Sequence, residues 1–220
     1  MNLLSIENLS KSYGEKQLFK DLTFGISQGE KVALVARNGT GKSTLLRILC
    51  NKDNADSGRV VFRKDLRISF LDQNPEFNEE LSIIDAVLLS ENEITIAIKR
   101  YEKLIEEQTD EISAAQSKDL EEAIAMMDKT NAWAYEVRVK QVLDKLGLVK
   151  LSQQLKTLSG GQKKRVALAK VLIEEPDLLI MDEPTNHLDV DMIEWLEEYL
   201  ENEDLSLFLV THDRYFLDNV

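Results

Sequence analysis

The chain has 220 residues, of which 43% are hydrophobic, so it can bury a sizeable core as one large domain or two small ones. Its 27 lysines and arginines stand against 40 aspartates and glutamates, and the resulting net charge of −13 disfavours a general role in binding nucleic-acid backbones, which needs a basic face. No apolar stretch approaches the length of a membrane-spanning helix.

The N-terminus and the cysteine content indicate the cellular compartment. Residues 1–9 lack the basic start and the long apolar centre of a signal peptide. The single cysteine, Cys50, allows no internal disulfide, and its leucine-rich surroundings favour a small buried apolar role. We therefore expect a soluble protein of the cytoplasm.

The first part of the chain has the sequence pattern of β-strands. Residues 3–9 and residues 22–26 show the alternation and composition of short antiparallel strands, and residues 32–35 (VALV) predict a buried strand. Between the first two strands, Tyr13 lies in the polar segment SKSYGEK. Its ring can stack on a nucleotide base or pack on the sheet as an ordinary loop tyrosine, and spacing alone leaves both readings open.

A phosphate-binding loop follows the third strand. Residues 36–44 (ARNGTGKST) fit the pattern GxxxxGK[ST] at every position except the first, and the alternative is an ordinary strand-turn-helix junction. Two glycines let backbone N–H groups point at phosphate oxygens, the lysine can reach the β- and γ-phosphates, and the serine can ligate Mg²⁺. We assign nucleotide binding to the whole loop: Ala36, Arg37, Asn38, Gly39, Thr40, Gly41, Lys42, Ser43 and Thr44.

Ala36 replaces the first glycine of that pattern. A positive φ at this position would cost about 1–2 kcal/mol because of the added Cβ. We expect a negative φ, since the preceding strand runs directly into the loop.

After the strands predicted at residues 59–62 and 67–71, turn-forming residues become scarce and apolar residues recur at helical spacing. We predict an inserted helical subdomain over residues 76–155, with an arm hairpin at about residues 92–130 that breaks near residues 113–118. The charges of this segment can equally mark a solvated face with no partner.

Polar side chains end three strands of a predicted parallel sheet. Gln73 follows one strand, Asp182 and Glu183 follow the apolar run at residues 178–181, and His212 follows the run at residues 207–210. The carboxyl ends of such strands line the ligand crevice, so these residues should converge on the phosphate loop.

Each of these side chains suits one task in phosphate chemistry. Asp182 can hold Mg²⁺ opposite Ser43, and Gln73 can reach both the metal and a water molecule. Glu183 can polarise the attacking water, while His212 can donate to the γ-phosphate and orient Glu183. The alternative for the adjacent acidic pair is a solvated strand end.

A second anion-binding device lies at residues 158–162 (LSGGQ), where a serine hydroxyl and bare glycine N–H groups precede a helix. One nucleotide needs only one such device. We therefore expect that two domains share each nucleotide, with the phosphate loop of one facing the LSGGQ of the other.

Together these motifs resemble the ATP-binding cassette (ABC) ATPase domain, because all appear in family order over the whole chain. Residues 183–189 (EPTNHLD), residues 211–218 (THDRYFLD) and the helical segment before LSGGQ resemble the ABC-F family, and the short arm is similar to that of its Uup-like branch. The resemblance implies an α/β P-loop NTPase fold with an antiparallel β subdomain, a RecA-like parallel-sheet core and an inserted α-helical subdomain. Residues 1–220 would form one such domain, the N-terminal cassette of a longer two-cassette chain.

The resemblance also implies residue roles. Tyr13 would stack on adenine, Lys42, Ser43 and Thr44 would bind phosphates and Mg²⁺, and Gln73 would sense the metal. Glu183 would be the catalytic base and His212 the switch. Binding across the interface with a second cassette would involve Ser159, Gly160, Gly161, Gln162 and Asp189.

The function that the resemblance implies is ATP hydrolysis coupled to ribosomes and tRNA in translation. Two alternatives stay open at this point. One is the ATP-binding subunit of a membrane transporter, which would need a membrane partner and a coupling surface near Gln73. The other is a nucleic-acid repair or remodelling ATPase, against which the acidic balance of this segment argues.

Overall fold

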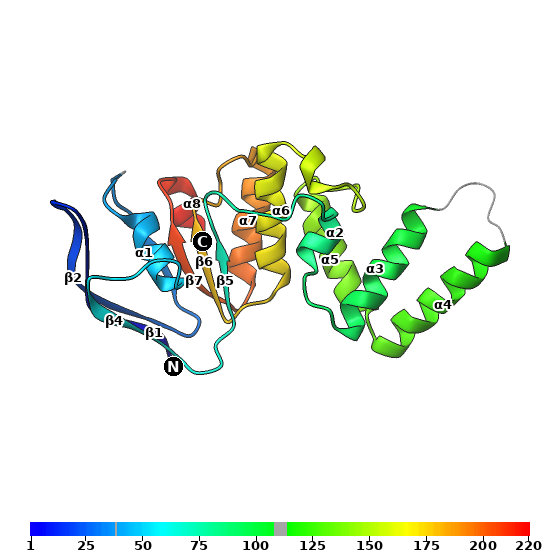
Figure 1. Ribbon diagram of the computed structural model, residues 1–220, viewed down its shortest axis with the longest axis horizontal. Helices are drawn as coiled ribbons and strands as arrows, with labels where there is room; N and C mark the ends of the chain where they lie inside the picture. The colour runs from blue at the N-terminus through cyan, green and yellow to red at the C-terminus, as the bar shows by residue number, and fades with distance from the viewer. Residues whose placement is uncertain (38, 108–113) are drawn as a thin grey trace. The chain divides into compact units, whose positions relative to one another are not determined.

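The structure is a computed structural model, which describes residues 1–37, 39–107 and 114–220. The described chain forms two compact units (Figure 1). The first combines residues 1–74 with residues 174–220, and the second comprises residues 75–173. We refer to them as the α/β unit and the helical unit.

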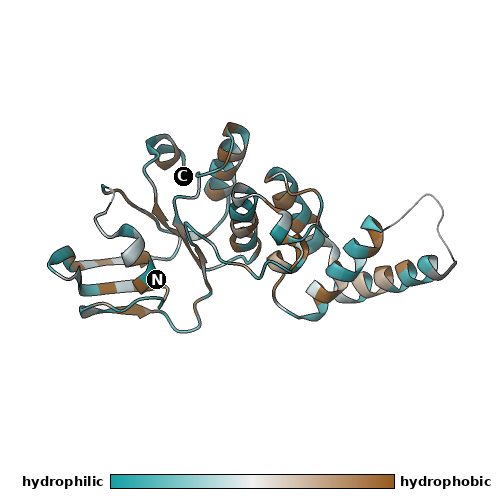
Figure 2. Cartoon of the chain, turned by 45° about the horizontal axis from the view of Figure 1, so that its top comes forward, coloured by the Kyte–Doolittle hydropathy of each residue, from teal (hydrophilic) through white to brown (hydrophobic). Residues whose placement is uncertain are grey.

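An antiparallel sheet begins the α/β unit. It consists of β1 (Asn2–Tyr13), β2 (Lys16–Ser27) and β4 (Ser57–Phe62) in the order β2-β1-β4. Hydrophobic and hydrophilic residues alternate along its strands (Figure 2), as expected of a sheet with one buried face. β1 continues to Tyr13, past the predicted end at residue 9, because register shifts between Ile6 and Lys11 interrupt the alternation on which the prediction depended.

A parallel sheet completes this unit. Its strands run in the order β3 (Lys31–Leu34), β7 (Ser206–Val210), β6 (Leu178–Asp182) and β5 (Ile68–Leu71), with every pairing parallel. The two central strands are buried at every residue. The prediction of a buried strand at residues 32–35 is wrong, because β3 lies at the edge of the sheet, ends at Leu34 and leaves Val35 56% exposed.

Helix α1 (Lys42–Leu49) packs between the two sheets. Its buried Leu45 and Leu46 belong to one core cluster with Leu4 of the antiparallel sheet and Phe208 of the parallel sheet. This packing fixes the start of α1, and with it the phosphate loop, against the ends of the parallel strands. Cys50 at the end of α1 packs against this cluster, and burial raises the pKa of its thiol to about 12.

Two further helices of the α/β unit follow the central strands. α7 (Val190–Asn202) begins after β6, and α8 (Arg214–Asn219) begins after β7. Each starts at an aspartate whose side chain accepts hydrogen bonds from backbone N–H groups of the first turn, Asp189 for α7 and Asp213 for α8.

The helical unit contains α2 (Ile83–Val87), α3 (Glu93–Glu106), α4 (Ala114–Thr130), α5 (Trp133–Lys145), a short 3₁₀ helix (Leu155–Thr157) and α6 (Gly160–Ile173). It extends beyond the predicted end at residue 155 because α6 packs against α2 and α5. Among the described residues, none of the helices has the length and apolar character needed to cross a membrane.

Helices α3 and α4 pack on each other, and Arg100 of α3 donates to Glu122 of α4 at 3.0 Å. The predicted break at residues 113–118 is wrong for residues 114–118, which are already helical in α4. The sequence of this stretch favours that outcome, since alanine, glutamine and lysine are good helix formers. Ser113 lies outside the described residues.

A buried charged cluster links α3 to α5 inside the helical unit. Glu102 and Glu136 are each 5% exposed, and Lys140 Nζ lies 2.9 Å from Glu102 Oε1 and 3.0 Å from Glu136 Oε1. Burial, assisted by the neighbouring Glu136, raises the pKa of the Glu102 carboxyl against the opposing effect of Lys140.

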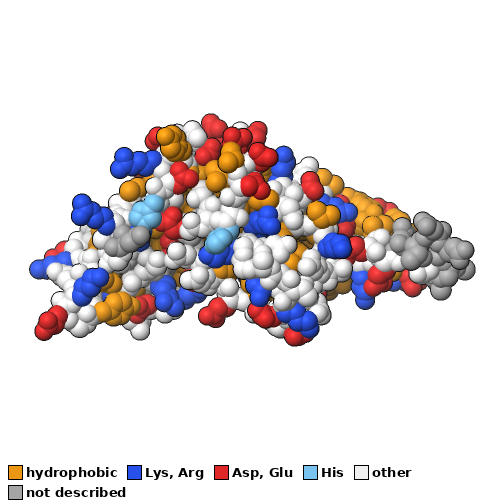
Figure 3. All heavy atoms as spheres, turned by 90° about the horizontal axis from the view of Figure 1, so that it is seen from above, with side chains coloured by type: hydrophobic (Ala, Val, Ile, Leu, Met, Phe, Trp, Pro, Cys, Tyr) orange, Lys and Arg blue, Asp and Glu red, His pale blue; other side chains and the backbone are white. Residues whose placement is uncertain are grey.

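On the molecular face shown in Figure 3, acidic and basic side chains are interspersed.

Candidate functional site

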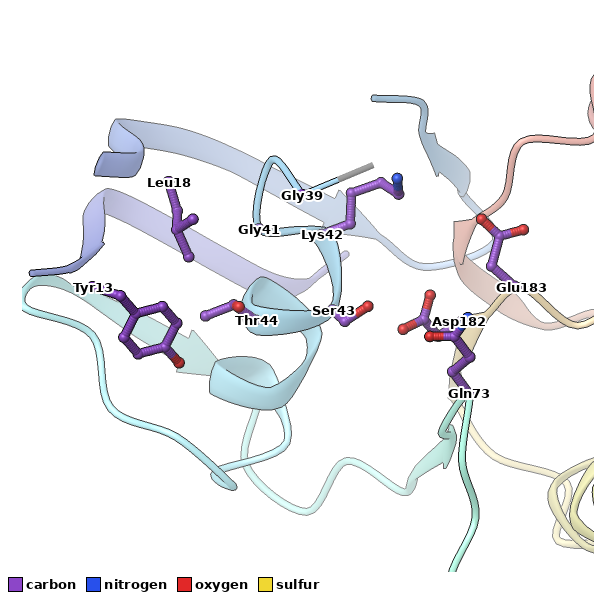
Figure 4. A pocket seen from close by; sticks show the side chains of 10 residues that line it. All are labelled: Tyr13, Leu18, Gly39, Gly41, Lys42, Ser43, Thr44, Gln73, Asp182 and Glu183. Atoms are coloured by element: carbon purple, nitrogen blue, oxygen red, sulfur yellow. The ribbon is translucent and has the colours of Figure 1, made fainter. Parts of the chain in front are cut away.

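A pocket of about 450 Å³ lies within the α/β unit (Figure 4). It is bounded by the turn after β1, the start of β2, the phosphate loop and the ends of β5 and β6. The lining residues are Tyr13, Leu18, Gly39, Gly41, Lys42, Ser43, Thr44, Gln73, Asp182 and Glu183.

The glycines of the phosphate loop are required by its backbone. Gly39 has a φ of 76° and Gly41 a φ of 97°, values that side chains rarely tolerate. A Cβ at Gly41 would also lie 2.8 Å from the Leu18 Cβ. Among the described residues, no side chain caps the start of α1, so its first N–H groups are available to an anion in the pocket.

Ala36 carries no backbone strain, because it is not among the non-glycine residues with positive φ. This is the conformation that the preceding strand led us to expect. Its carbonyl accepts a hydrogen bond from Lys42 Nζ at 2.7 Å, and the Arg37 carbonyl accepts another at 3.3 Å. Thr40 Oγ1 also donates to the Arg37 carbonyl, at 2.8 Å. Asn38 lies outside the described residues.

The side chain of Lys42, the lysine of this loop, contacts the side chain of His212. The lysine is 9% exposed, and its Nζ lies 2.9 Å from His212 Nε2. An ammonium group offers only donors, so in this contact the lysine donates and Nε2 accepts. The same Nε2 lies 3.4 Å from Glu183 Oε1.

Asp182 ends β6 and is 4% exposed. Burial raises the pKa of its carboxyl, a hydrogen bond with Ser43 opposes the rise, and the charge of Glu183 adds to it. Ser43, Asp182 and Gln73 supply the oxygen ligands that Mg²⁺ prefers. Within the described ranges, no group of three or more His, Cys, Asp or Glu side chains could hold a metal.

Glu183 adopts an unusual backbone conformation. Its φ is 53°, which costs a non-glycine residue of the order of 1 kcal/mol or more. The conformation is held by a hydrogen bond from its backbone N–H to the Val210 carbonyl at 2.7 Å. Its Oε2 accepts from the His212 backbone N–H at 3.3 Å. The ends of β6 and β7 thus bring Glu183 and His212 together.

Tyr13 ends β1, is 54% exposed, and lies beside the pocket near Leu18 (Figure 4). A ring packed on the sheet would be buried, so this exposure favours the base-stacking interpretation. Sequence reasoning missed Leu18, because it placed the second strand at residues 22–26 whereas β2 begins at Lys16. It also missed Lys16, whose Nζ lies 3.7 Å from the position a Cβ would take at Gly39.

The LSGGQ residues belong to the helical unit. Ser159 Oγ accepts from the Gln162 N–H at 3.2 Å, and Gln162 Oε1 accepts from the Ser159 N–H at 2.9 Å, which is a reciprocal capping box at the start of α6. Around Gly160 the space for a Cβ is open, and Gly161 is half-buried.

Asp189 is not among the residues that line the pocket. Its Oδ1 accepts from the Met192 N–H at 3.0 Å and caps α7. The structure therefore gives this side chain a capping contact that the sequence prediction of a nucleotide-binding role had not included.

Comparisons with known proteins agree with this arrangement. The family model described as ABC transporter matches residues 19–186. The chain is 43% identical to the uncharacterized ABC transporter ATP-binding protein YfmR of Bacillus subtilis, covering 100% of this chain and 35% of that protein. It is 34% identical to the energy-dependent translational throttle protein EttA of Mycobacterium tuberculosis (99% and 39% covered) and 37% identical to the ATP-binding protein Uup of Haemophilus influenzae (99% and 33% covered).

The chain therefore spans between about a third and two fifths of the length of these relatives. Among solved structures, the ATP-binding subunit of an ABC transporter superposes with a TM-score of 0.69 over 96% of this chain and 79% of that chain, at 24% identity. This likeness confirms the predicted α/β fold, with its antiparallel sheet, parallel sheet and helices.

Proposed function

From the premise that this chain belongs to the ABC transporter family, as an ATP-binding domain, we propose that it binds MgATP in the pocket of Figure 4 and hydrolyses it to ADP and phosphate. One observation carries the proposal. Lys42, Ser43, Asp182 and Glu183 open into a single pocket. A cation, a hydroxyl and two carboxylates at the ends of parallel strands are the groups that phosphoryl transfer requires.

The contacts suggest how these residues divide the work. Lys42 would exchange the carbonyls of Ala36 and Arg37 for the β- and γ-phosphate oxygens, which releases His212. Ser43 and Asp182, with Gln73 nearby, would hold Mg²⁺, which neutralises phosphate charge when bound. Thr44, one residue into α1 from Ser43, would contribute to the same phosphate site.

Glu183 would orient the attacking water. The water oxygen attacks the γ-phosphorus as the bond to the ADP oxygen breaks, and the Glu183 carboxylate takes the water proton. The backbone N–H of His212 already contacts Glu183, so the histidine can hold the carboxylate while its freed imidazole faces the γ-phosphate.

The test is the Glu183→Gln substitution in the full-length protein that carries this chain. We expect ATP hydrolysis at this site to fall by about 10²-fold or more, with ATP affinity retained, because the amide cannot accept the proton while the phosphate contacts remain. Glu194→Gln is the matched control, an exposed glutamate on α7 of the same unit. Hydrolysis by Glu183→Gln at the wild-type rate would overturn the role of Glu183.

We propose further that the whole protein pairs two cassettes. Support comes from the LSGGQ motif, a second anion-binding motif, and from relatives that are about two and a half to three times as long as this chain. Ser159, Gly160, Gly161 and Gln162 would then contact the γ-phosphate of a nucleotide held by the other cassette, and Asp189 would lie in the loop between cassettes. The placement of the protein in the cytoplasm stays a prediction from the sequence.

A role on the ribosome is the partner proposal that the comparisons favour, since EttA is named as a translational throttle protein. The full-length protein with Glu183→Gln, and the matching change in its other cassette, should sediment with ribosomes from cell lysate only when ATP is present. Sedimentation with membranes would favour a transporter subunit instead. Sedimentation with DNA or RNA free of ribosomes would favour a repair or remodelling ATPase.

A further inference from the structure

The Tyr13 ring at the edge of the pocket rests on a polar network that lies outside the phosphate loop. We propose that Asp53 and Lys11 are positioning residues that hold the Tyr13 ring in place for the nucleotide base. The inference rests on the proposed binding of ATP in this pocket. It assigns the two residues no contact with the nucleotide itself.

The first contact is a hydrogen bond on the phenol. Tyr13 Oη donates to Asp53 Oδ2 at 2.5 Å. An exposed tyrosine ring otherwise rotates about its side-chain bonds, and the loss of that freedom would lower the affinity for a stacked base. A charge-assisted hydrogen bond is strong enough to select one ring orientation before the ligand arrives.

The second contact holds the acceptor. Lys11, which is 8% exposed, places its Nζ 3.2 Å from Asp53 Oδ1, and the same Nζ donates to the Asn54 carbonyl. Each oxygen of Asp53 therefore has its own donor, one from Lys11 and one from Tyr13. Hydrogen bonding from Tyr13, followed by contributions from Asn54 and Lys11, lowers the pKa of the Asp53 carboxyl, so it remains a charged acceptor at neutral pH.

Lys11 also acts on the ring directly. Its Nζ lies 5.1 Å from the centroid of the Tyr13 ring, within the range of a cation–π interaction. Lys11 and Tyr13 both belong to β1, so the strand supplies the ring together with one of its supports.

The network ties the base end of the pocket to the phosphate end. Asp53 lies in the turn just after α1, the helix whose first residues form the phosphate site. In the same turn, Asp56 accepts from the Ser12 backbone N–H at 2.7 Å. Base and phosphates would therefore meet a single rigid body, and preorganisation of this kind improves affinity by reducing the ordering that binding requires.

The experiment separates the base from the phosphates in the full-length protein. Photolabelling with 8-azido-ATP, read by mass spectrometry on the peptide that contains Tyr13, gives a half-saturating concentration for this site alone. Competition by magnesium tripolyphosphate, which has no base, gives the affinity of the phosphate end. We expect Asp53→Ala to raise the half-saturating concentration by about 3- to 30-fold, a part of the value of one base–aromatic stack, with the tripolyphosphate inhibition constant unchanged.

Companion variants sharpen the outcome. Tyr13→Phe should give a similar loss, and the double variant should lose little more, because both changes break one hydrogen bond. Asp53→Asn keeps the side-chain size and an acceptor oxygen, so it should fall between wild type and Asp53→Ala. Glu7→Gln is the control, since Glu7 lies on the same strand and pairs with Arg59 away from the pocket.

Unchanged labelling of Asp53→Ala would overturn the inference. So would an equal loss of tripolyphosphate affinity, because it would show damage to the whole site. A wild-type protein that 8-azido-ATP does not label at this peptide would instead overturn the proposed nucleotide binding itself, and this inference with it.

Discussion

Buried carboxylates have different neighbours in the two compact units. In the α/β unit, Asp182 is 4% exposed, faces a pocket, and lies beside a second carboxylate, Glu183. In the helical unit, Glu102 and Glu136 are buried to the same degree, but Lys140 lies within 3.0 Å of both. A buried charge destabilises the fold unless it is paired. Asp182 would gain such a partner from the cation that we propose for this pocket, whereas Lys140 already supplies one to the two glutamates.

The same contrast holds for the two glycine devices. The phosphate loop of the α/β unit depends on left-handed backbone at Gly39 and Gly41, with Leu18 packed against Gly41. The LSGGQ turn of the helical unit has open space around Gly160 and a capping box that satisfies its own N–H groups. Both motifs lead into a helix, but a side chain of the same unit packs against the phosphate loop at Gly41, whereas the space around Gly160 is open.

The largest effect is expected from Gly41→Ala, which disrupts the phosphate loop. Gly41→Ala places a methyl group 2.8 Å from the Leu18 Cβ at a φ of 97°, so we expect a loss of about 1–3 kcal/mol in the free energy of unfolding and no measurable ATP binding at this pocket. Gly160→Ala serves as the control for stability, since nothing lies near its Cβ and the position begins a helix. Thermal unfolding should show a loss for the first variant alone; equal melting temperatures would contradict the packing argument.

A smaller effect is expected for Asp182→Asn, which should raise the melting temperature of the ligand-free protein and reduce the stabilisation by MgATP. Asp182→Asn removes a buried charge but keeps the size of the side chain, so the ligand-free protein should melt higher than wild type, by about 2–4 °C for each kcal/mol gained. MgATP should raise the melting temperature of wild type and scarcely that of the variant. If MgATP stabilises both proteins equally, Asp182 does not hold the metal.

The smallest effect concerns the helical unit and its pH dependence. The pKa of Glu102 is raised above its ordinary value of 4.5, so the folded state holds this proton more tightly than the unfolded chain. That contribution to stability is present below about pH 4.5 and is lost as the pH rises through the folded pKa. Glu102→Gln removes it, while Glu136 still pairs with Lys140.

The melting temperature of Glu102→Gln should therefore rise relative to wild type between pH 4 and pH 8, because only the wild type loses this contribution. Glu107→Gln, an exposed glutamate at the end of the same helix, should show no such trend. MgATP should not change the difference, because no residue of the cluster lines the pocket. A flat pH difference would show that Lys140 neutralises both carboxylates.

The sequence predicted those features that depend on residue type at the ends of strands. The apolar runs before Asp182 and His212 became β6 and β7, buried at every residue, and parallel pairing brought their ends together. The same reasoning overestimated β3, because apolar composition does not reveal which strand lies at the edge of a sheet.

Features that depend on long-range register could not be predicted. Leu18 reaches the pocket through the pairing of β1 and β2, which shifts register several times along its length. Asp53 meets Tyr13 across forty residues of sequence, from a turn whose composition indicates only that the chain bends. Neither contact has a local sequence signal, and both required the folded chain.

The left-handed backbone at Glu183 offers a handle for protein engineering. Asparagine accepts a positive φ more readily than glutamate does, and it has no carboxylate. On the role proposed for Glu183, asparagine at this position would relieve the backbone strain and stop ATP hydrolysis in a single step. Such a variant would be more stable and would keep ATP bound for longer. It would serve to isolate the cellular partners that bind the ATP-bound form.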